Sequence, residues 1–268
     1  MFKNKDAGLV TLRDSAAVDS ALMSVDGKTI LQRFHLKSDV IEYDLPARHL
    51  SVPVPGQMLV ENRADPRDEQ ARQAKRAKAK EGAKEGAEDG PAASAMNDGA
   101  TAFQWARRLE FEESAGRAKM EGSVVVNHQP DDKGEAPVRV DADELIAEFV
   151  PETAVADAKK GPDQPKERVA AGAETKGAAP SMARLRVKSF SAVGNILISR
   201  EGAELSAGRV DYDPATEWVV ARGSGRTPAV FTHPSGNGSA TAEELWLNTK
   251  TWQVKVIDVS TRAGGPTH

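Results

Sequence analysis

The segment Gly27-Lys28-Thr29 ends in the way that a nucleotide-binding glycine-rich loop does. In that loop, backbone N–H groups curl around the phosphates, and a further glycine is needed five residues before Gly27. That position holds Leu22. We therefore predict that no nucleotide site forms at this segment.

The histidines are the next candidates, because imidazole nitrogens bind metals when they occur at ligand spacings. None of the spacings between them is typical of a metal site, and we expect them on the surface or in loops. The chain has no cysteine, which excludes thiolate metal sites and disulfide bonds. We predict no metal and no cofactor. The histidines are His35, His49, His128, His233 and His268.

Asp211 and Asp213 are two residues apart and would share one face of a strand, as a catalytic carboxylate pair could. Asp213 precedes Pro214, and this dipeptide starts turns. We interpret Asp213 as a turn residue and Asp211 as a solvated one. No other residue types and spacings indicate a catalytic group, so we predict a protein that is not an enzyme.

Composition limits the remaining classes. The 268 residues carry a net charge of -4 that is spread along the chain, so nothing indicates nucleic-acid binding. No apolar run approaches the roughly 20 residues of a transmembrane helix. The start, Met1-Phe2-Lys3-Asn4-Lys5, has no apolar core after its charges and is not a signal peptide as it stands. Three explanations stay open: a cytoplasmic protein, a missing native start, or a segment of a longer polypeptide.

Two polar stretches divide the chain. Residues 61–99 contain almost no aliphatic or aromatic side chain larger than alanine, and residues 151–181 have only Val155 and Val169 as large aliphatics. Such segments cannot bury enough surface to offset their loss of conformational entropy. We expect two polar insertions, the first disordered or transiently helical and the second disordered. Three patterned blocks and a tail remain, at residues 8–60, 100–150, 182–260 and 261–268.

All three blocks alternate apolar and polar residues with the period of a strand that has one buried face. Phe103, Trp105, Leu109 and Phe111 occupy odd positions between polar neighbours. Near the end of the chain, Trp252, Val254 and Val256 alternate with Gln253 and Lys255. Turn sequences such as Glu201-Gly202 and Asp213-Pro214 separate the runs. The pattern predicts an all-β protein of antiparallel strands.

The blocks also resemble one another, which indicates an internal repeat. Residues 38–44 and 207–213 both end in Tyr-Asp and lead through a proline turn into a returning strand. A glycine followed by alternating aliphatics begins at Gly122 and again at Gly194. Shorter similarities are Ala142-Asp143-Glu144-Leu145 and Ala242-Glu243-Glu244-Leu245.

The order of these elements resembles the repeat of the OstA-like (organic solvent tolerance) family. Residues 194–198, 205–213 and 219–223 carry the resemblance, which is clearest over 182–258 and weaker over 8–60. This family includes lipopolysaccharide-transport proteins of the Gram-negative envelope. The resemblance implies a taco-like antiparallel β-jelly-roll in the periplasm that receives acyl chains of lipopolysaccharide or a related lipid. It also implies partners of the same kind, other OstA-like β domains joined by edge-strand pairing.

The inward positions of this alternation give the candidate lipid groove. These residues either fill a plain core or line an open groove, and the alternation alone does not separate the two. A ligand-free scaffold is thus one alternative, and a carbohydrate-binding protein that stacks sugars on Trp105, Trp218, Trp246 or Trp252 is another. The candidate groove residues are Val124, Val126, Leu145, Ile196, Ile198, Leu205, Val210, Tyr212, Leu245 and Leu247.

Overall fold

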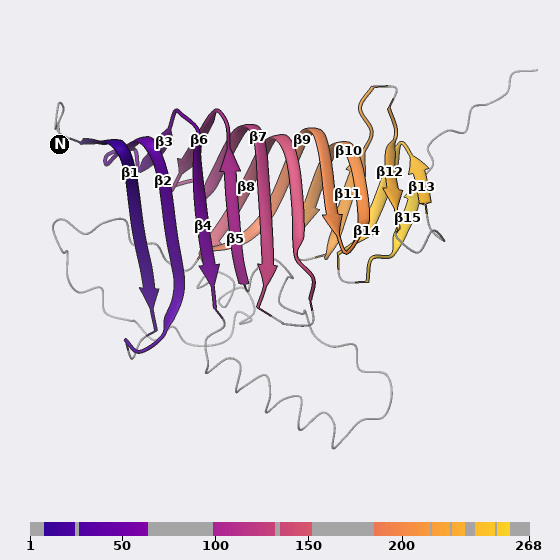
Figure 1. Cartoon of the computed structure of the whole chain (residues 1–268), viewed down its shortest axis with the longest axis horizontal. Coiled ribbons are helices and arrows are strands. Elements are labelled where there is room, and N and C mark those ends of the chain that lie inside the picture. Colours follow the sequence, from indigo (N-terminus) through magenta and orange to yellow (C-terminus); the bar gives the residue numbers. More distant parts are fainter. Residues whose placement is uncertain are drawn as a thin grey trace, which may run out of the picture.

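The protein is an elongated all-β molecule in a computed structural model that describes residues 8–24, 27–63, 99–131, 135–151, 185–214, 216–225, 227–233, 239–249 and 251–257 (Figure 1). The strands are antiparallel and belong to one hydrogen-bonded sheet, which confirms the predicted fold class. Both polar insertions fall largely outside the described residues. Across the described ranges, no helix has the length and apolar character needed to cross a membrane.

The strands follow one another along the chain with short turns between most of them. The long strands β1, β2 and β7 to β10 alternate with two groups of short strands, β3 to β6 and β11 to β15 (Figure 1). They are β1 (Leu9–Met23), β2 (Ile30–Asp44), β3 (His49–Val52), β4 (Gly56–Asn62), β5 (Gly99–Trp105), β6 (Arg108–Glu112), β7 (Arg117–Pro130), β8 (Val138–Pro151), β9 (Leu185–Arg200), β10 (Ala203–Asp213), β11 (Trp218–Arg222), β12 (Ala229–Thr232), β13 (Ser239–Ala242), β14 (Glu244–Asn248) and β15 (Val254–Ile257).

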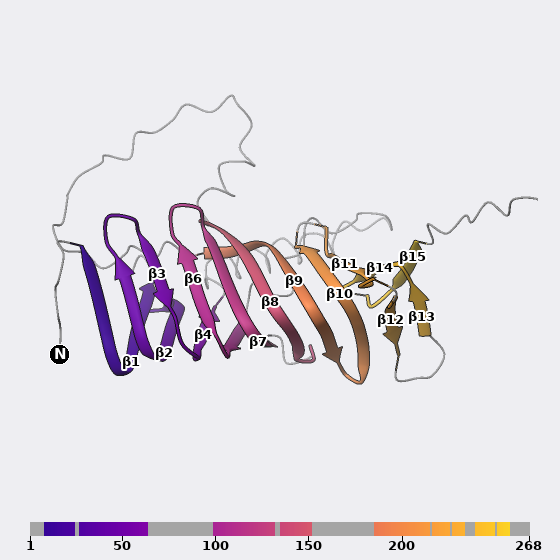
Figure 2. The same ribbon diagram turned by 90° about the horizontal axis from the view of Figure 1, so that it is seen from above.

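Several long strands change partners halfway along their length, so the sheet folds into two layers. The C-terminal half of β7 pairs with β5, while its N-terminal half pairs with β6. β2 likewise pairs first with β4 and then with β3, and β10 pairs first with β12 and then with β11. We call the layer with β4, β5, β12 and β13 the first layer, and the layer with β3, β6, β11, β14 and β15 the second. The long strands can be followed over the bend in two views (Figures 1 and 2).

The bend, which we call the crease, is made by a bulge that occurs at the same place in three hairpins. In β1–β2, β7–β8 and β9–β10, the strand pairing shifts register at this point. The bulged residues are Asp14-Ser15, Gly122-Ser123 and Gly194-Asn195, and all six have φ between 44° and 84°. Two successive left-handed residues turn the strand sharply, because a bulge adds local twist and bend. Glycine and Asp/Asn tolerate this conformation best.

Segments that are similar in sequence occupy similar places along the crease. Gly122 and Gly194 are the first residues of two of the bulges, as just described. Residues 38–44 and 207–213 are the stretches of β2 and β10 that run from the crease to the far end of the second layer. Asp143 lies opposite the bulge of β7, and Glu243 joins β13 to β14 at the crease.

The first block belongs to the same sheet as the other two. Seven residues of β4 pair with β5, from Gly56 opposite Trp105 to Asn62 opposite Gly99. In the second layer β3 pairs with β6. Residues 8–60 therefore extend the roll by two long strands.

Two windows that look like single strands in the sequence are divided. The alternating run from Phe103 to Phe111 is broken at Ala106-Arg107, where the chain crosses the crease between β5 and β6. The run from Trp252 is also shorter than predicted, because β15 begins at Val254. Val256 is 51% exposed rather than buried, since β15 is the last strand of its layer.

The opposite side from the crease, where the strands of both layers end, is the mouth of the roll. β4 ends and β5 begins at the mouth in the first layer, at Asn62 and Gly99. β8 ends and β9 begins there in the second layer, where Pro151 lies opposite Leu185. The two polar insertions predicted from the sequence thus leave and re-enter the roll on this side.

A test of the crease is the substitution Gly122→Ala. An added Cβ at Gly122 would lie 2.5 Å from Arg107 Cγ and 3.1 Å from the Arg107 backbone nitrogen, and φ is +84°. Left-handed backbone costs about 1–2 kcal/mol for an L-residue, and the contact with Arg107 adds to this. We expect the free energy of unfolding in urea to fall by about 2–3 kcal/mol.

Gly225→Ala is the matched control, because Gly225 has φ +58° and only open space where an added Cβ would lie. It should cost about 1 kcal/mol, from the backbone alone. Equal losses in the two variants would show that the crease is not tightly packed at Gly122.

Candidate functional site: the apolar interior

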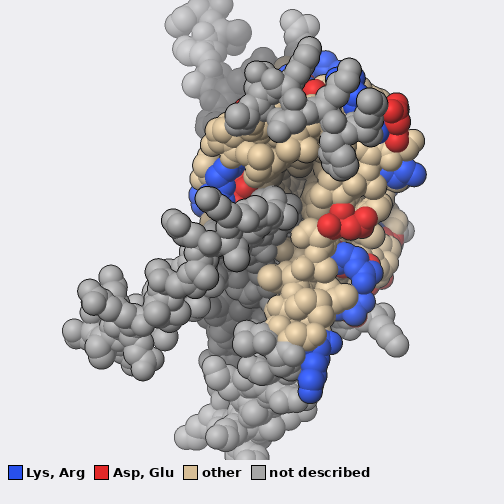
Figure 3. All heavy atoms as spheres, turned by 90° about the vertical axis from the view of Figure 1, so that its left-hand side faces the viewer, with Lys and Arg blue, Asp and Glu red and all other residues tan. Residues whose placement is uncertain are grey.

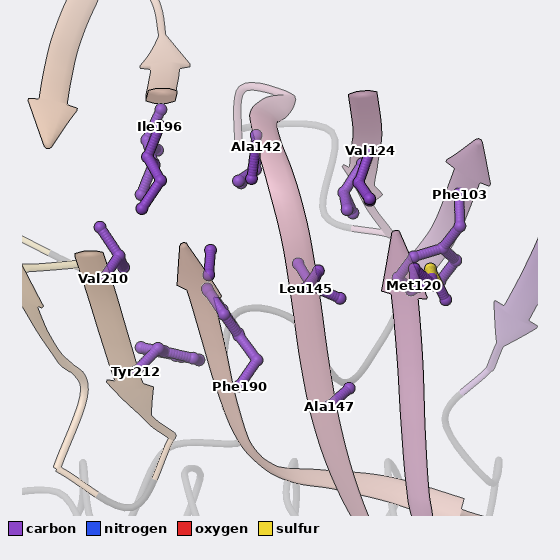
Figure 4. Close-up of a cluster of buried hydrophobic side chains, with 14 of the residues drawn as sticks. Phe103, Met120, Val124, Ala142, Leu145, Ala147, Phe190, Ile196, Val210 and Tyr212 are labelled. Carbon is purple, nitrogen blue, oxygen red and sulfur yellow. The ribbon is translucent and has the colours of Figure 1, made fainter. Parts of the chain in front are cut away.

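The space between the two layers is filled by aliphatic and aromatic side chains. All ten residues predicted for the groove lie there, and each has 5% or less of its surface exposed. Figure 4 shows part of this cluster, with Leu145, Phe190 and Tyr212 contributed by successive strands. The ring centroids of Phe190 and Tyr212 are 5.0 Å apart. The alternation in the sequence therefore identified an inward face, whether or not it receives a ligand.

The first cavity between the layers, of about 90 Å³, lies in the N-terminal half. Its walls are almost entirely apolar, and both layers contribute to it. The first layer supplies Gln32, Phe34, Met58, Val60, Asn62, Thr101 and Phe103, and the second Leu50, Leu109, Phe111, Ala118, Phe149 and Val187.

Two smaller cavities of about 40 Å³ each continue this space toward the C-terminal end. The second cavity shares Phe103 and Phe149 with the first, and the third shares Val140 and Phe190 with the second. Because neighbouring cavities share wall residues, the three form a row along the axis of the roll, separated by side chains. We call this row of cavities the groove.

The predicted residues divide into two groups, those that line a cavity and those that do not. Val126, Leu145, Ile198, Tyr212 and Leu247 line the second or third cavity. The other five line none of these three cavities and are packed within the hydrophobic core. They are Val124, Ile196, Leu205, Val210 and Leu245.

Sequence reasoning missed most of the walls of the first cavity. Phe34, Met58 and Val60 belong to the first block, where the family resemblance is weakest, and no inward face was assigned there. The period of two was present, since Met58 and Val60 are separated by one residue, Leu59, on β4. That outward neighbour is itself apolar, which hid the alternation.

Polar side chains appear at the mouth side of the interior. Gln32 Nε2 donates a hydrogen bond to Asn62 Oδ1 at 2.7 Å, beside the first cavity. His128 was predicted on the surface or in a loop, and this prediction is wrong. It is 2% exposed on β7, and its Nδ1 lies 2.9 Å from Thr101 Oγ1, because a hydroxyl partner allows imidazole to be buried.

At the C-terminal end, contacts between side chains join the two layers across the mouth. The Nη1 of Arg200, at the end of β9, donates to the carbonyl oxygen of Thr249 at 3.3 Å. The Arg200 guanidinium lies 5.6 Å from the centre of the Trp252 ring, and the ring of Phe231 on β12 lies 6.4 Å from that centre. Trp252 therefore contacts side chains of the first layer at this end of the roll.

Charged residues are placed on the outer face of the roll. Seen from the β1 end, Lys, Arg, Asp and Glu side chains lie on the outside, and uncharged atoms form the walls of the hollow between the layers (Figure 3). Glu121 receives hydrogen bonds from Arg108 Nε at 2.8 Å and from Lys119 Nζ at 2.7 Å. These bonds lower the pKa of Glu121 to about 2, and the bond from Arg108 has the largest effect.

Asp211 was predicted to be solvated, and the structure corrects this. It accepts hydrogen bonds from Arg209, from Ser191 Oγ at 2.6 Å and from Arg222 Nη1 at 2.7 Å. The Arg209 contact is the main cause of a lowered pKa for Asp211. The carboxyl group therefore ties three strands together on the outer face. Asp213 does start a turn, as predicted, through its backbone oxygen.

The four tryptophans do not form a shared surface. Trp105 is buried at the crease, where its Nε1 donates to the Val54 carbonyl oxygen at 3.0 Å. Trp218 and Trp246 lie side by side on the outer face, with ring centroids 6.3 Å apart. The Lys255 ammonium sits 4.4 Å from the centre of the Trp218 ring, where a sugar would stack. Within the described ranges, no group of three or more His, Asp or Glu side chains could hold a metal ion.

No known family profile matches the sequence, and no curated protein matches it either. One solved structure with some likeness is LptH from Pseudomonas aeruginosa, described as the LptA-homologous periplasmic component of the lipopolysaccharide transport device. The superposition covers 62% of this chain and 89% of LptH, with a TM-score of 0.37 and 13% identity. A likeness of this size carries no argument about function, so membership of the OstA-like family stays a prediction.

The outer-face ion pairs predict a pH dependence of stability. Because the pKa of Glu121 is about 2 in the folded chain and about 4.5 ordinarily, its stabilising effect is complete above pH 4.5 and is lost as pH falls through 2. We expect Glu121→Gln to be less stable than the unsubstituted protein at pH 7. The difference, measured by urea unfolding, should shrink steadily between pH 4.5 and pH 2.

Arg108→Met is the matched control, because it removes the strongest donor to Glu121 and keeps the carboxyl group. The acid-dependent part of the stability should become smaller in this variant. An unchanged pH profile in both variants would refute the role of this contact.

Proposed function

We propose that the protein is an envelope lipid-binding or lipid-bridging module that buries acyl chains between its two β layers. The observation that carries this proposal is the apolar groove, which lies between the layers and runs along the axis of the roll. The sequence resemblance to OstA-like domains supports the same role, and with it the periplasm as location and lipopolysaccharide or a related lipid as ligand.

The walls of the groove suit acyl chains better than any polar ligand. The three cavities are lined mainly by Phe, Val, Leu, Ile and Met side chains contributed by both layers. Burial of each methylene contributes about 0.8 kcal/mol, so a lipid with several chains can bind without any catalytic or charged group. Passive burial of this kind needs no cofactor.

Binding requires the mouth to widen. A cavity that takes a benzene molecule has a volume of roughly 150 Å³. The three cavities of the groove, of about 90, 40 and 40 Å³, are each smaller than that. The layers are covalently continuous at the crease, whereas at the mouth side chains meet, as Arg200 and Trp252 do. Separation at the mouth therefore breaks fewer backbone hydrogen bonds than separation anywhere else.

The ends of the roll support a bridging role. Among the strands that the structure describes, β1 pairs with β2 alone and β15 pairs only with β14. Large apolar residues are exposed on both strands, including Leu9 and Val10 at one end and Val256 and Ile257 at the other. Edge strands with exposed apolar residues are suited to pairing with the edge of another domain. Stacked rolls would then present one longer groove.

Photo-crosslinking from inside the groove tests lipid binding. A photoreactive amino acid at Ile198 or Leu247, which line the third cavity, should give lipid adducts in Gram-negative cells. Val193 is the control position, because it is 41% exposed on the outer face. Consistent absence of adducts at the two inner positions, or equal labelling at Val193, would refute the proposal.

Disulfide trapping tests end-to-end pairing. The chain has no native cysteine, so every disulfide bond that forms must involve an introduced thiol. A chain with both Val10→Cys and Val256→Cys should form ladders longer than dimers on a non-reducing gel, since each copy offers one thiol at each end. A chain with Val10→Cys and Val193→Cys should stop at dimers, because Val193 lies on an outer face. Equal ladders from both chains would contradict edge pairing.

A further inference from the structure

Three irregularities coincide at the C-terminal end of the groove. Trp252 has φ +55°, a backbone conformation that a bulky L-residue rarely adopts. Its indole Nε1 is buried without a hydrogen-bond partner. The Nε of Arg200 is likewise buried without one. Most buried polar groups are paired, so two unpaired donors on neighbouring side chains need an explanation.

Both residues line the third cavity of the groove. The same cavity is lined by Phe190, Tyr212 and Leu247 on its apolar side. Polar walls are supplied by His128, Glu135 and Thr249. Here the otherwise apolar groove acquires a charged and hydrogen-bonding end.

Arg200 contributes a positive charge that no carboxylate balances. Its contacts are the Thr249 carbonyl oxygen and the Trp252 ring. Among the residues that the structure describes, no Asp or Glu forms an ion pair with Arg200. Glu135 borders the same cavity but is exposed to solvent and forms no ion pair with it. Other arginines near strand ends differ in this respect, since Arg139, on the neighbouring strand β8, is held by Asp141 at 2.7 Å.

The missing partner must be an acceptor, because Arg and Trp side chains can only donate. A negative charge suits the site better than a neutral oxygen, since a guanidinium makes its strongest hydrogen bonds to oxyanions. The cavity is too small for a large polar ligand, and its continuation along Val140 and Phe190 is apolar. These features together describe a small anionic group attached to an apolar chain.

We propose that Arg200 and Trp252 hold the oxyanion head, a carboxylate or phosphate, of an amphiphile whose chain lies in the groove beside Phe190 and Val140. The inference rests on the proposed lipid-binding function and names the polar subsite within it. Both nitrogens are shielded from solvent, so the head reaches them as the turn that carries Trp252 moves. Trp252 also has a positive φ, and backbone strain of this kind clusters at ligand sites.

Binding of short amphiphiles to the full chain tests the subsite. Decyl phosphate and decanoate carry an oxyanion, decanol has the same chain without a charge, and inorganic phosphate has the charge without a chain. We expect both oxyanion ligands to bind about tenfold tighter than decanol, with inorganic phosphate weaker than either. Equilibrium dialysis gives the four dissociation constants.

Substitutions at the subsite should remove the preference and leave chain binding intact. Arg200→Met keeps the aliphatic stem and should weaken decyl phosphate and decanoate about tenfold, with decanol unchanged. Trp252→Phe keeps an aromatic ring without the N–H and should give a smaller loss of the same kind. Arg139→Met and Trp218→Phe are the matched controls on the outer face, and neither should alter any of the constants. Thermal unfolding confirms that each variant is folded.

The outcomes separate this inference from the function on which it rests. If none of the ligands with a chain binds, the groove itself is not a lipid site. If decanol binds as tightly as decyl phosphate, and Arg200→Met changes neither, the groove stands and the subsite is overturned. Inorganic phosphate binding as tightly as decyl phosphate would also overturn the proposal, because the site would then recognise free phosphate rather than an amphiphile.

Discussion

The left-handed bulge halfway along three of the long hairpins is the constraint on which the rest of the structure depends. At Asp14-Ser15, Gly122-Ser123 and Gly194-Asn195, two successive residues with positive φ turn a strand from one layer into the other. Because neighbouring strands must follow the same bend to keep their hydrogen bonds, the bulges align into a crease. The crease brings two inner faces together without a separate connection for each strand.

This architecture explains why the interior is tight on one side and looser on the other. Side chains near the crease, such as Val124 and Val210, are 1% exposed or less and lie between layers that have only begun to diverge. Toward the mouth the layers are further from their covalent connection, and the cavities lie there. The same geometry explains why the polar residues of the interior, Gln32, Asn62 and Arg200, are found near the strand ends.

The outer face keeps this arrangement in register. Ion pairs across strands, such as those of Glu121 with Arg108 and of Glu244 with Arg222, join neighbours within the second layer. Charged pairs directly across strands favour one register over its neighbours, because a shift by one residue would turn them into the apolar interior. The inner face supplies the burial of apolar surface, and the outer face supplies specificity of pairing.

The sequence alone determined the antiparallel strands and the inward face of the second and third blocks. Period-two alternation depends on local chain geometry, so ten inward residues could be named before any fold was known. Gly122 and Gly194 also indicated equivalent places, since glycine is the residue that left-handed backbone selects. Asp14-Ser15 makes the same bulge without glycine, and the first block was therefore hard to match.

The tertiary structure alone decided the features that depend on residues far apart in the chain. These are the division of the Phe103–Phe111 run at the crease, the burial of His128 beside Thr101, and the contact of Arg200 with Trp252. Spacing between layers is set by packing across them, and no local pattern in the sequence encodes it.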